Sequence, residues 1–537
     1  MANTLKFGNG EWYGKKDTIL AYNDENSNYK PLPFDFSRAS SATVINKDGL
    51  IEEVGNNIPR IDFLGNTKGA LKLEPQRTNL ITYSEDFTNP YWTKSGASIQ
   101  GDPSTAGSEL VTSWTNKDFA SFSSSGSNIT QMVSSGSGNN NYSAVTITSG
   151  KIYKLKFTSS QSIPCQIRIS PNTNLTGASV VLNSLLSGTN EVYFTASSNY
   201  TYIGFYAPNS FTDTQISNFT LKEVQGFTSP DGTTNAYKLV EGTNNGGHTA
   251  YKLNTSISSG ANYTYSVFVK GTERVLQMVL SSGFASNFCN FDLSDGTIGS
   301  KNGLVDSNIT SFSNGWYRCD ITALSNGASA HLEFILAESK TSSRYTTYQG
   351  NGTSGVYIYG AQLEQGSYAT SYIPTQGSAV TRLKDACSQT PPTSVIGQTE
   401  GTVFAEIDYT PHSINYESVA SLQGTSTQQY LECYFNSANK INIGIYNGGA
   451  VQVSFASASQ TKGIKKIAIA YKSNDFAVYL NGTQIHTDNS GSVPLLSSLG
   501  LGINYSGSTF QLSQPIKQFQ LYNTRLSNSE LAALTQV

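Results

Sequence analysis

The chain has 537 residues, a length typical of about three or four domains, and a formal net charge of −3. Charged residues make up 13% of it, against about 25% in an average soluble protein. No cluster of Lys and Arg is present to neutralise phosphates, so the sequence disfavours nucleic-acid binding. No apolar run reaches about 18 residues, so it predicts no membrane span.

The composition predicts an all-β protein. Tyr (31) and Phe (25) far outnumber Met (3), and aromatic and β-branched residues suit a pleated, half-buried surface better than a long helix. The cysteines are odd in number and widely spaced, which predicts buried free thiols rather than a disulfide framework or a zinc site. A single Cys289–Cys319 pair stays open as an alternative.

Residues 1–80 predict a small N-terminal β module. The turn signals Lys47-Asp48-Gly49 and Gly55-Asn56-Asn57 separate short strands. Such a module buries little core alone, so we expect it to dock on a neighbouring domain or a partner. This expectation also rests on early apolar residues without a visible core: Leu5, Phe7, Trp12 and Tyr13. The first residues lack a secretory-signal pattern, so we expect export by lysis or a non-Sec route.

Two related β-sandwiches are predicted next, over residues 81–226 and 227–384. Both contain a Ser-Gly turn, alternating aromatic and aliphatic residues, and a closing strand that ends near Gln-Gly. The paired segments are 149–160 with 259–271, and 216–226 with 356–366.

Residues 385–537 predict a third β domain, entered through Pro391-Pro392. Asn481-Gly482 predicts a type I′ hairpin turn, because both positions must adopt positive φ. One helix is predicted near the end, where Ser527 and Glu530 have capping-box spacing. Strands are predicted at 402–411, 430–436, 440–447, 451–457, 465–485 and 515–523.

Three stretches resemble known families. Residues 36–92, FSRASSATVINKDG…LEPQRTNLITYSEDF…W, resemble a recurrent opening of bacteriophage tail-fibre and head-fibre proteins. Residues 350–382 resemble the closing segment of carbohydrate-binding-module-like sandwiches in those proteins. Residues 465–534 resemble the second half of a laminin-G-like, concanavalin-type jelly roll. The resemblance implies tandem jelly-roll sandwiches, and it implies a homo-oligomer, with a trimer expected.

Catalysis has weak support in the sequence. Glu406 and Asp408, two apart on a strand, or Glu432 could serve a glycoside hydrolase. The four histidines stand singly at 248, 331, 412 and 486, and Trp92 and Trp316 lie within strand patterns typical of core residues. Calcium would need clustered oxygen ligands; Asp102, Asp231 and Asp475 are isolated, so a structural calcium ion has no support. We expect no metal, no cofactor and no enzyme activity.

The best candidates for ligand contacts are Tyr446, Asn447, Asn504 and Tyr505, in two Gly-containing loops. A tyrosine face can stack on a sugar ring while amide groups bond its hydroxyls. With the resemblance, this predicts a non-enzymatic virion fibre that docks to other virion proteins through its N-terminus and binds host cell-surface polysaccharide. The alternatives are a head fibre on the capsid surface and a polysaccharide depolymerase.

Overall fold

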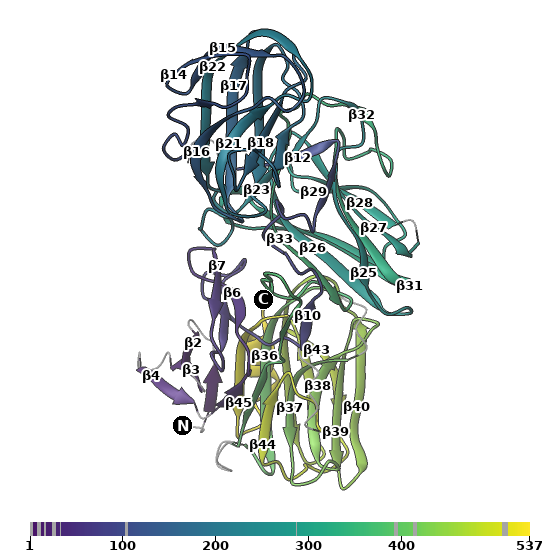
Figure 1. Cartoon of the computed structure of the whole chain (residues 1–537). Helices are drawn as coiled ribbons and strands as arrows, with labels where there is room; N and C mark the ends of the chain where they lie inside the picture. The colour runs from purple at the N-terminus through teal and green to yellow at the C-terminus, as the bar shows by residue number, and fades with distance from the viewer. Residues whose placement is uncertain are drawn as a thin grey trace.

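The computed structural model describes residues 4–537 except 8–11, 16–17, 24–27, 33, 102–105, 286, 391–395, 412–415 and 507–513, with backbone alone for the strands before Asp35 and for Thr195. The chain is all-β, and its strands form three β-sandwiches arranged one beyond another (Figure 1). We call them the base, middle and outer sandwiches, from the end that holds both termini. The one α-helix of the described chain, α1 (Asn528–Thr535), is too short to span a membrane.

The base sandwich combines strands from both ends of the chain. One sheet has the order β43-β42-β41-β36-β45-β9-β8, with β1 also on β45: β43 (Thr483–Asp488), β42 (Phe476–Leu480), β41 (Gly463–Lys472), β36 (Glu400–Tyr409), β45 (Ile516–Tyr522), β9 (Ala70–Lys72), β8 (Arg60–Asp62), β1 (Thr4–Phe7). The other has the order β2-β3-β5-β35-β44-β37-β38-β39-β40, with β4 on β3: β2 (Trp12–Lys15), β3 (Thr18–Asn23), β5 (Phe34–Ser37), β35 (Ala386–Gln389), β44 (Ser498–Leu501), β37 (Glu417–Gln423), β38 (Tyr430–Phe435), β39 (Lys440–Asn447), β40 (Ala450–Ser459), β4 (Asn28–Leu32).

The middle sandwich is organised around β31 (Tyr317–Ala337), whose first half pairs in one sheet and whose second half pairs in the other. The strands with its first half are β30 (Asp306–Ser311), β26 (Asn262–Lys270), β33 (Gly355–Gln365), β23 (Tyr237–Glu241) and β12 (Ala97–Gln100). Those with its second half are β25 (Thr249–Ser256), β11 (Thr93–Ser95), β27 (Val275–Phe284), β28 (Asn287–Asp292) and β29 (Thr297–Asn302).

The outer sandwich has two five-stranded sheets. The first holds β13 (Thr115–Asn116), β16 (Asn141–Ile147), β21 (Tyr200–Tyr206), β18 (Gln166–Ser170) and β19 (Ser179–Leu182). The second holds β14 (Ser121–Ser125), β15 (Asn128–Ser134), β22 (Phe211–Val224), β17 (Ile152–Ser159) and β20 (Gly188–Thr195). Three small ladders complete the chain: β6 (Ala42–Ile45) with β7 (Ile51–Val54), β10 (Arg77–Asn79) with β34 (Val380–Arg382), and β24 (Asn245–Gly246) with β32 (Tyr348–Gln349).

The sandwiches are nested, which differs from the predicted linear division into 1–80, 81–226, 227–384 and 385–537. β11 and β12 precede the outer sandwich in sequence but pair with β25 and β23 of the middle sandwich. The outer sandwich is therefore an insertion in the middle one. In the same way the middle sandwich is inserted in the base sandwich, because β5 pairs with β35 and β9 pairs with β45.

The predicted module at 1–80 is therefore not a separate domain. Phe36, Leu71 and Leu73 belong to the same buried cluster as the apolar residues of β36, β38 and β41. The core on which this segment packs is formed by residues far along the sequence, so the segment shows no core of its own. The side chains of Leu5, Phe7, Trp12 and Tyr13, and the Pro391-Pro392 linker, lie outside the described residues.

The repeat predicted from the sequence is confirmed in the strand pairing. β17 pairs with β22 in the outer sandwich, and β26 pairs with β33 in the middle one, with Leu155 opposite Leu221 and Tyr265 opposite Leu363. Each pair is therefore the same structural unit in its own sandwich.

Local signals are confirmed at several points. Asn481 and Gly482 have φ values of 48° and 81°, as a type I′ turn requires, and they join β42 to β43. Ser527 and Glu530 form the predicted capping box of α1. The five cysteines are buried as free thiols, Cys289 and Cys319 included.

The β6–β7 hairpin connects the base to the middle sandwich. Its residues Ile45 and Ile51 pack with Trp316, Tyr359 and other aromatic residues on an outer face of the middle sandwich. The backbone N–H of Ile51 donates to the carbonyl of Pro230 at 3.0 Å. The hairpin thus packs directly against the middle sandwich.

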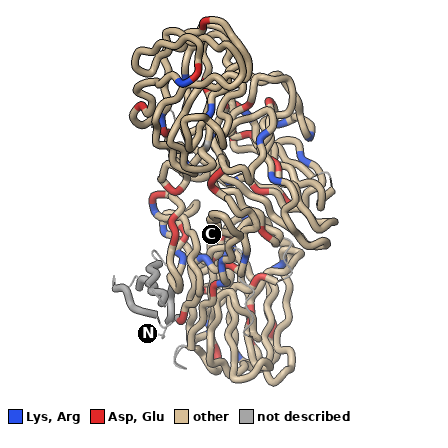
Figure 2. Tube along the Cα trace, viewed as in Figure 1, with Lys and Arg blue, Asp and Glu red and all other residues tan. Residues whose placement is uncertain are grey.

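A buried cluster of five charged side chains lies where the chain passes between the base and middle sandwiches. We call it the charge cluster; in Figure 2 residues of both signs come close together near this junction. Its members are between 0% and 2% exposed: Arg38, Arg60, Glu74, Arg382 and Asp385. Arg60 pairs with Glu74 at 2.6 Å and also with Asp385, and Arg38 pairs with Asp385 at 3.1 Å.

The charge cluster joins segments that are far apart in sequence. Arg382 pairs with Glu74 at 2.7 Å, and the hydroxyl of Ser371 donates to the same carboxylate at 2.6 Å. Burial opposes ionisation of Glu74, but the charges of Arg382 and Arg60 outweigh it and hold the pKa of that carboxyl well below its usual range. The outgoing and returning chain segments are therefore held together by buried ion pairs.

Candidate functional site

The candidate site lies on the outward face of the β37–β38–β39 sheet of the base sandwich. Along β38, Leu431, Cys433 and Phe435 point into the core. Because side chains alternate along a strand, Tyr430, Glu432 and Tyr434 lie on the opposite face. On β39, Tyr446 is the register partner of Tyr430, so both tyrosines lie on that outward face.

Five tyrosines gather on this sheet face, and we call the set the tyrosine face: Tyr416, Tyr430, Tyr434, Tyr446 and Tyr505. The ring of Tyr430 stacks on Tyr446 at 4.6 Å between centroids and on Tyr505 at 4.1 Å. A second stack joins Tyr416 and Tyr434 at 4.0 Å. Tyr430 is buried between its neighbours, whereas the other four rings are partly exposed.

Side chains of β37 place Tyr505 on this face. The hydroxyls of Ser418 and Ser421 donate to the carbonyl of Ile503 at 2.8 and 2.7 Å. The amide of Gln423 donates to the carbonyl of Asn504 at 2.8 Å. The segment that carries Tyr505 is thereby fixed across β37, and its ring is held in position before any ligand binds.

Glu432 lies between the two tyrosine stacks. Burial raises the pKa of its carboxyl, while the hydroxyl of Tyr416 and the backbone of Tyr505 donate to it and oppose that rise. Its position on β38 makes it a support that orients Tyr416 and the Tyr505 segment. It is 6% exposed, so little of it reaches solvent.

Two of the four predicted site residues, Tyr446 and Tyr505, are brought together by Tyr430. The two amides are used within the protein. Asn447 donates to Ser492 Oγ at 2.8 Å, and Asn504 Oδ1 accepts from the backbone N–H of Ser506 at 3.1 Å. These contacts give both asparagines a part in fixing the loops that flank the tyrosine face.

The sequence interpretation did not include Tyr416, Tyr430 and Tyr434. A signal for two of them was present, because the spacing in Tyr-Leu-Glu-Cys-Tyr places Tyr430, Glu432 and Tyr434 on one side of a strand. The stacking on Tyr505 carried no local signal.

The predicted carboxylates do not come together. Glu406 and Asp408 share the outward side of β36, as predicted, with Glu406 half-buried and Asp408 exposed. That strand lies in the sheet opposite to the one that carries Glu432. Within the described residues no group of three or more His, Cys, Asp or Glu is placed to hold a metal ion.

The remaining candidates have structural contacts. Trp92 and Trp316 are 1% and 2% exposed, as predicted for core residues. His248 is buried and contacts the carbonyl of Tyr348, and His486 stacks on Phe455. The ring of His331 lies near the side chain of Asn254. The carboxylate of Asp231 accepts hydrogen bonds from Ser229 and Thr233, and Asp475 forms an ion pair with Arg525. Asp102 and His412 lie outside the described residues.

Comparisons with known proteins give partial likenesses. No family model and no curated protein matches the chain. Similar solved structures include CBM40 of Ruminococcus gnavus IT-sialidase (16% identity, TM-score 0.23, 26% of this chain and 84% of that chain) and NanB sialidase of Streptococcus pneumoniae (15%, 0.23, 26% and 24%). Another is the CBM22-1–CBM22-2 tandem of Paenibacillus barcinonensis Xyn10C (9%, 0.17, 54% and 98%). These low TM-scores carry no assignment of ligand.

Proposed function

We propose that this chain is a non-enzymatic adhesin that binds cell-surface polysaccharide through the tyrosine face. The observation that supports this most strongly is the stack of Tyr446, Tyr430 and Tyr505 on an outward sheet face, held by β37 side chains. Aromatic faces with hydroxyl groups at their edges combine apolar contact with neutral hydrogen bonding, which suits uncharged or weakly charged sugars. A rigid support reduces the entropy lost when a ligand binds.

We further propose that the protein is part of a bacteriophage particle, as a tail fibre or a head fibre, and acts as a trimer. The resemblance of residues 36–92 and 350–382 to virion proteins supports this, and the two stretches supply charge-cluster residues on both sides of the junction. Several copies on one particle would raise the avidity of weak sugar contacts by about 10²–10⁴. Imaging of virions with antibody-labelled protein would distinguish tail from head, and unlabelled particles would refute the virion assignment.

A polysaccharide depolymerase is the alternative, and Glu432 is the residue that favours it, because burial raises its pKa as a general acid requires. Most glycoside hydrolases pair two carboxyl groups within about 5–9.5 Å. Glu406 and Asp408 lie on the other sheet, so they do not supply that pair. Release of reducing ends from host polysaccharide that disappears in Glu432→Gln or Glu406→Gln would overturn the non-enzymatic assignment.

Replacing both Tyr446 and Tyr505 by Ala is expected to weaken adsorption to host polysaccharide about tenfold or more. Each aromatic contact contributes about 0.5–1.5 kcal/mol, and 1.4 kcal/mol corresponds to a factor of ten in affinity. The measurement is adsorption of purified protein to host cells, with the unfolding midpoint recorded alongside. Tyr193→Ala, a half-buried tyrosine on β20 of the outer sandwich, is the matched control. Unchanged adsorption in the folded double variant would refute this site.

A further inference from the structure

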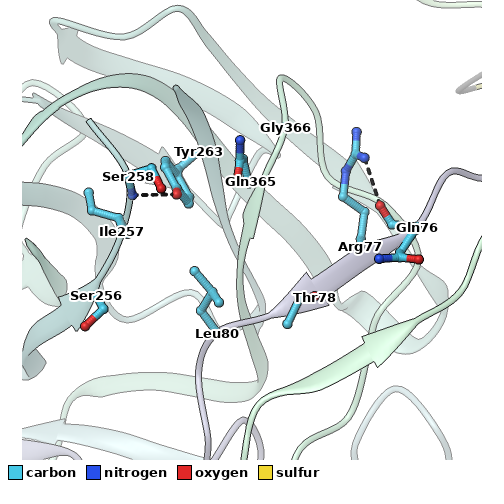
Figure 3. A pocket seen from close by; sticks show the side chains of 10 residues that line it. All are labelled: Gln76, Arg77, Thr78, Leu80, Ser256, Ile257, Ser258, Tyr263, Gln365 and Gly366. Carbon is cyan, nitrogen blue, oxygen red and sulfur yellow. Dashed lines mark hydrogen bonds between the residues drawn. The ribbon is translucent and has the colours of Figure 1, made fainter. Parts of the chain in front are cut away.

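A groove of about 710 Å³ lies beside the strand through which the chain enters the middle sandwich (Figure 3). One wall is β10 with its flanking residues, and the opposite wall is the turn from β25 to β26. The end of β33 completes it. The lining residues come from these three segments: Gln76, Arg77, Thr78, Leu80, Ser256, Ile257, Ser258, Tyr263, Gln365 and Gly366. This volume lies within the range of small-molecule sites in proteins.

The β10 wall is fixed to the middle sandwich by Asn79, which is fully buried. Its amide nitrogen donates to the carbonyls of Ala361 and Ile373 at 3.2 and 2.9 Å, and its Oδ1 accepts from the backbone N–H of Leu363 at 3.1 Å. The N–H of Leu80 donates to the carbonyl of Leu363 at 2.8 Å. These hydrogen bonds hold the β10 wall against β33.

The opposite wall is fixed as well. The backbone N–H of Ser258 donates to the hydroxyl of Tyr263 at 2.9 Å, a contact that Figure 3 shows. The hydroxyl of Ser325 donates to the carbonyls of Ser258 and Ala261 at 2.6 and 2.8 Å. Because both walls are tied to the same sheet, the groove is formed in the free protein and a ligand would not have to order it.

Arg77 is the single cation among the ten lining residues, and its hydrogen-bonding capacity is only partly used. Its Nη1 donates to the carbonyl of Gln76 at 3.0 Å. Its Nε is buried and is ion-paired with Glu364 Oε2 at 3.7 Å, and the guanidinium lies 5.6 Å from the centroid of the Tyr368 ring. The carboxylate of Glu364 is already bonded by Thr370 and Gln362. Because its Nε is buried, Arg77 can donate to a ligand in the groove only through its Nη1 and Nη2 groups.

Gly366 makes room for this guanidinium. A Cβ at position 366 would lie 2.8 Å from Arg77 Nε and 2.9 Å from Nη2, both closer than a normal contact. A side chain there would require the guanidinium to shift, and the φ of 154° at Gly366 would also strain the backbone of another residue. Gly366→Ala therefore acts on the place of Arg77 and on the backbone at once, and its unfolding midpoint has to be recorded beside its binding.

We propose that this groove binds a short oligosaccharide that carries a carboxylate, such as a uronic-acid trisaccharide. An arginine fork suits a carboxylate, because two N–H groups can bond both of its oxygens. The hydroxyls of Ser256 and Ser258 and the amides of Gln76 and Gln365 suit sugar hydroxyls, which both donate and accept. Leu80 and Ile257 add the apolar contact that the faces of sugar rings need.

A peptide fits the groove less well. Peptides that bind as added strands need a free backbone edge. The backbone of β10 already pairs with β34, and Leu80 already bonds Leu363. The groove is formed by the middle sandwich and the entering strand, so this site does not depend on the tyrosine face of the base sandwich.

The test is calorimetric titration of the full chain with trigalacturonate, triguluronate and trimannuronate, and with maltotriose as the neutral probe. At least one acidic trisaccharide is expected to bind at least tenfold more tightly than maltotriose. Arg77→Gln and Gly366→Ala should each weaken that binding at least tenfold. Lys68→Gln, which removes an exposed cation outside the groove, and the Tyr446→Ala/Tyr505→Ala variant should leave it unchanged.

No binding by any of the three acidic trisaccharides would overturn the proposal, as would equal binding of maltotriose or full binding by Arg77→Gln. Displacement of the sugar by trialanine, a tripeptide probe, would also overturn it, in favour of a peptide site. If Arg77→Gln lowers the unfolding midpoint, the exposed pair Ser256→Ala with Gln365→Ala gives the same readout without disturbing an ion pair. Adsorption of the tyrosine variant tests the tyrosine face, and the titrations with trisaccharides alone confirm or refute the groove.

Discussion

Asp385→Asn is expected to lower the free energy of unfolding by about 3–5 kcal/mol, a large part of the stability of one domain. The carboxylate of Asp385 is the partner of both Arg38 and Arg60, and all three side chains are fully buried. Removing it leaves three arginines of the charge cluster facing Glu74 alone, with the excess charge buried. Loss of one partner of a buried ion pair costs more than loss of the whole pair.

The measurement is denaturant unfolding of the full chain, followed by tyrosine fluorescence. Asp408→Asn is the matched control, because it makes the same chemical change on an exposed carboxylate of the base sandwich, where less than about 0.5 kcal/mol is expected. A loss of stability in Asp385→Asn no greater than in this control would show that the cluster is not a stabilising joint.

Deletion of residues 1–80 is expected to prevent folding of the base sandwich altogether. It removes β5, β8 and β9 from the two sheets and takes Phe36, Leu71 and Leu73 out of the core. Each large buried side chain that is lost costs about 2–5 kcal/mol, so the sum exceeds the stability of a typical domain. The measurement is limited proteolysis with mass spectrometry, in which the outer sandwich, which takes no strand from residues 1–80, should survive and residues 385–537 should be cut.

The matched experiment excises the outer sandwich, by joining Gly101 directly to Gly226. A Cβ at Gly101 would lie 2.6 Å from the carbonyl oxygen of Gln225, so the two ends of the insertion are adjacent and a short join closes the gap. This larger deletion is expected to leave the base and middle sandwiches folded and able to adsorb. Proteolytic loss of the base sandwich in the excised protein, or its survival after removal of 1–80, would contradict the nested arrangement.

Much of the strand content could be predicted from the sequence, because it follows from local patterns. Alternation along 430–436 and 440–447 predicts β38 and β39, and Asn481-Gly482 predicts the turn after β42. Nesting has no such local signal. β8 and β9 are three residues long, too short for an alternation to show, and β45, the partner of β9, lies at the other end of the chain. Such pairings depend on the whole fold.

The same limit applies to the candidate site. Tyr446 and Tyr505 could be predicted as site residues because each lies near Gly in a loop. Their stacking on Tyr430 could not, because it depends on how the strands pair in the folded protein. Glu74 and Asp385 look like ordinary surface carboxylates in the sequence, since nothing near them signals burial. Their partners Arg60 and Arg382 become neighbours only when the segment that leaves the base sandwich packs against the segment that returns to it.

The nested order of the sandwiches has a consequence for synthesis on the ribosome. The outer sandwich is contiguous in sequence and can close first, the middle one closes when β33 emerges, and the base waits for β45 near the end of translation. Until β35 emerges β5 lacks one partner, and until β45 emerges β9 lacks one, and these unpaired edges can pair with other nascent chains. Slow elongation or crowded polysomes should therefore lower the yield of folded protein more for this chain than for the same sandwiches arranged one after another in the sequence. Holdase chaperones that cover the first 80 residues would relieve that harm.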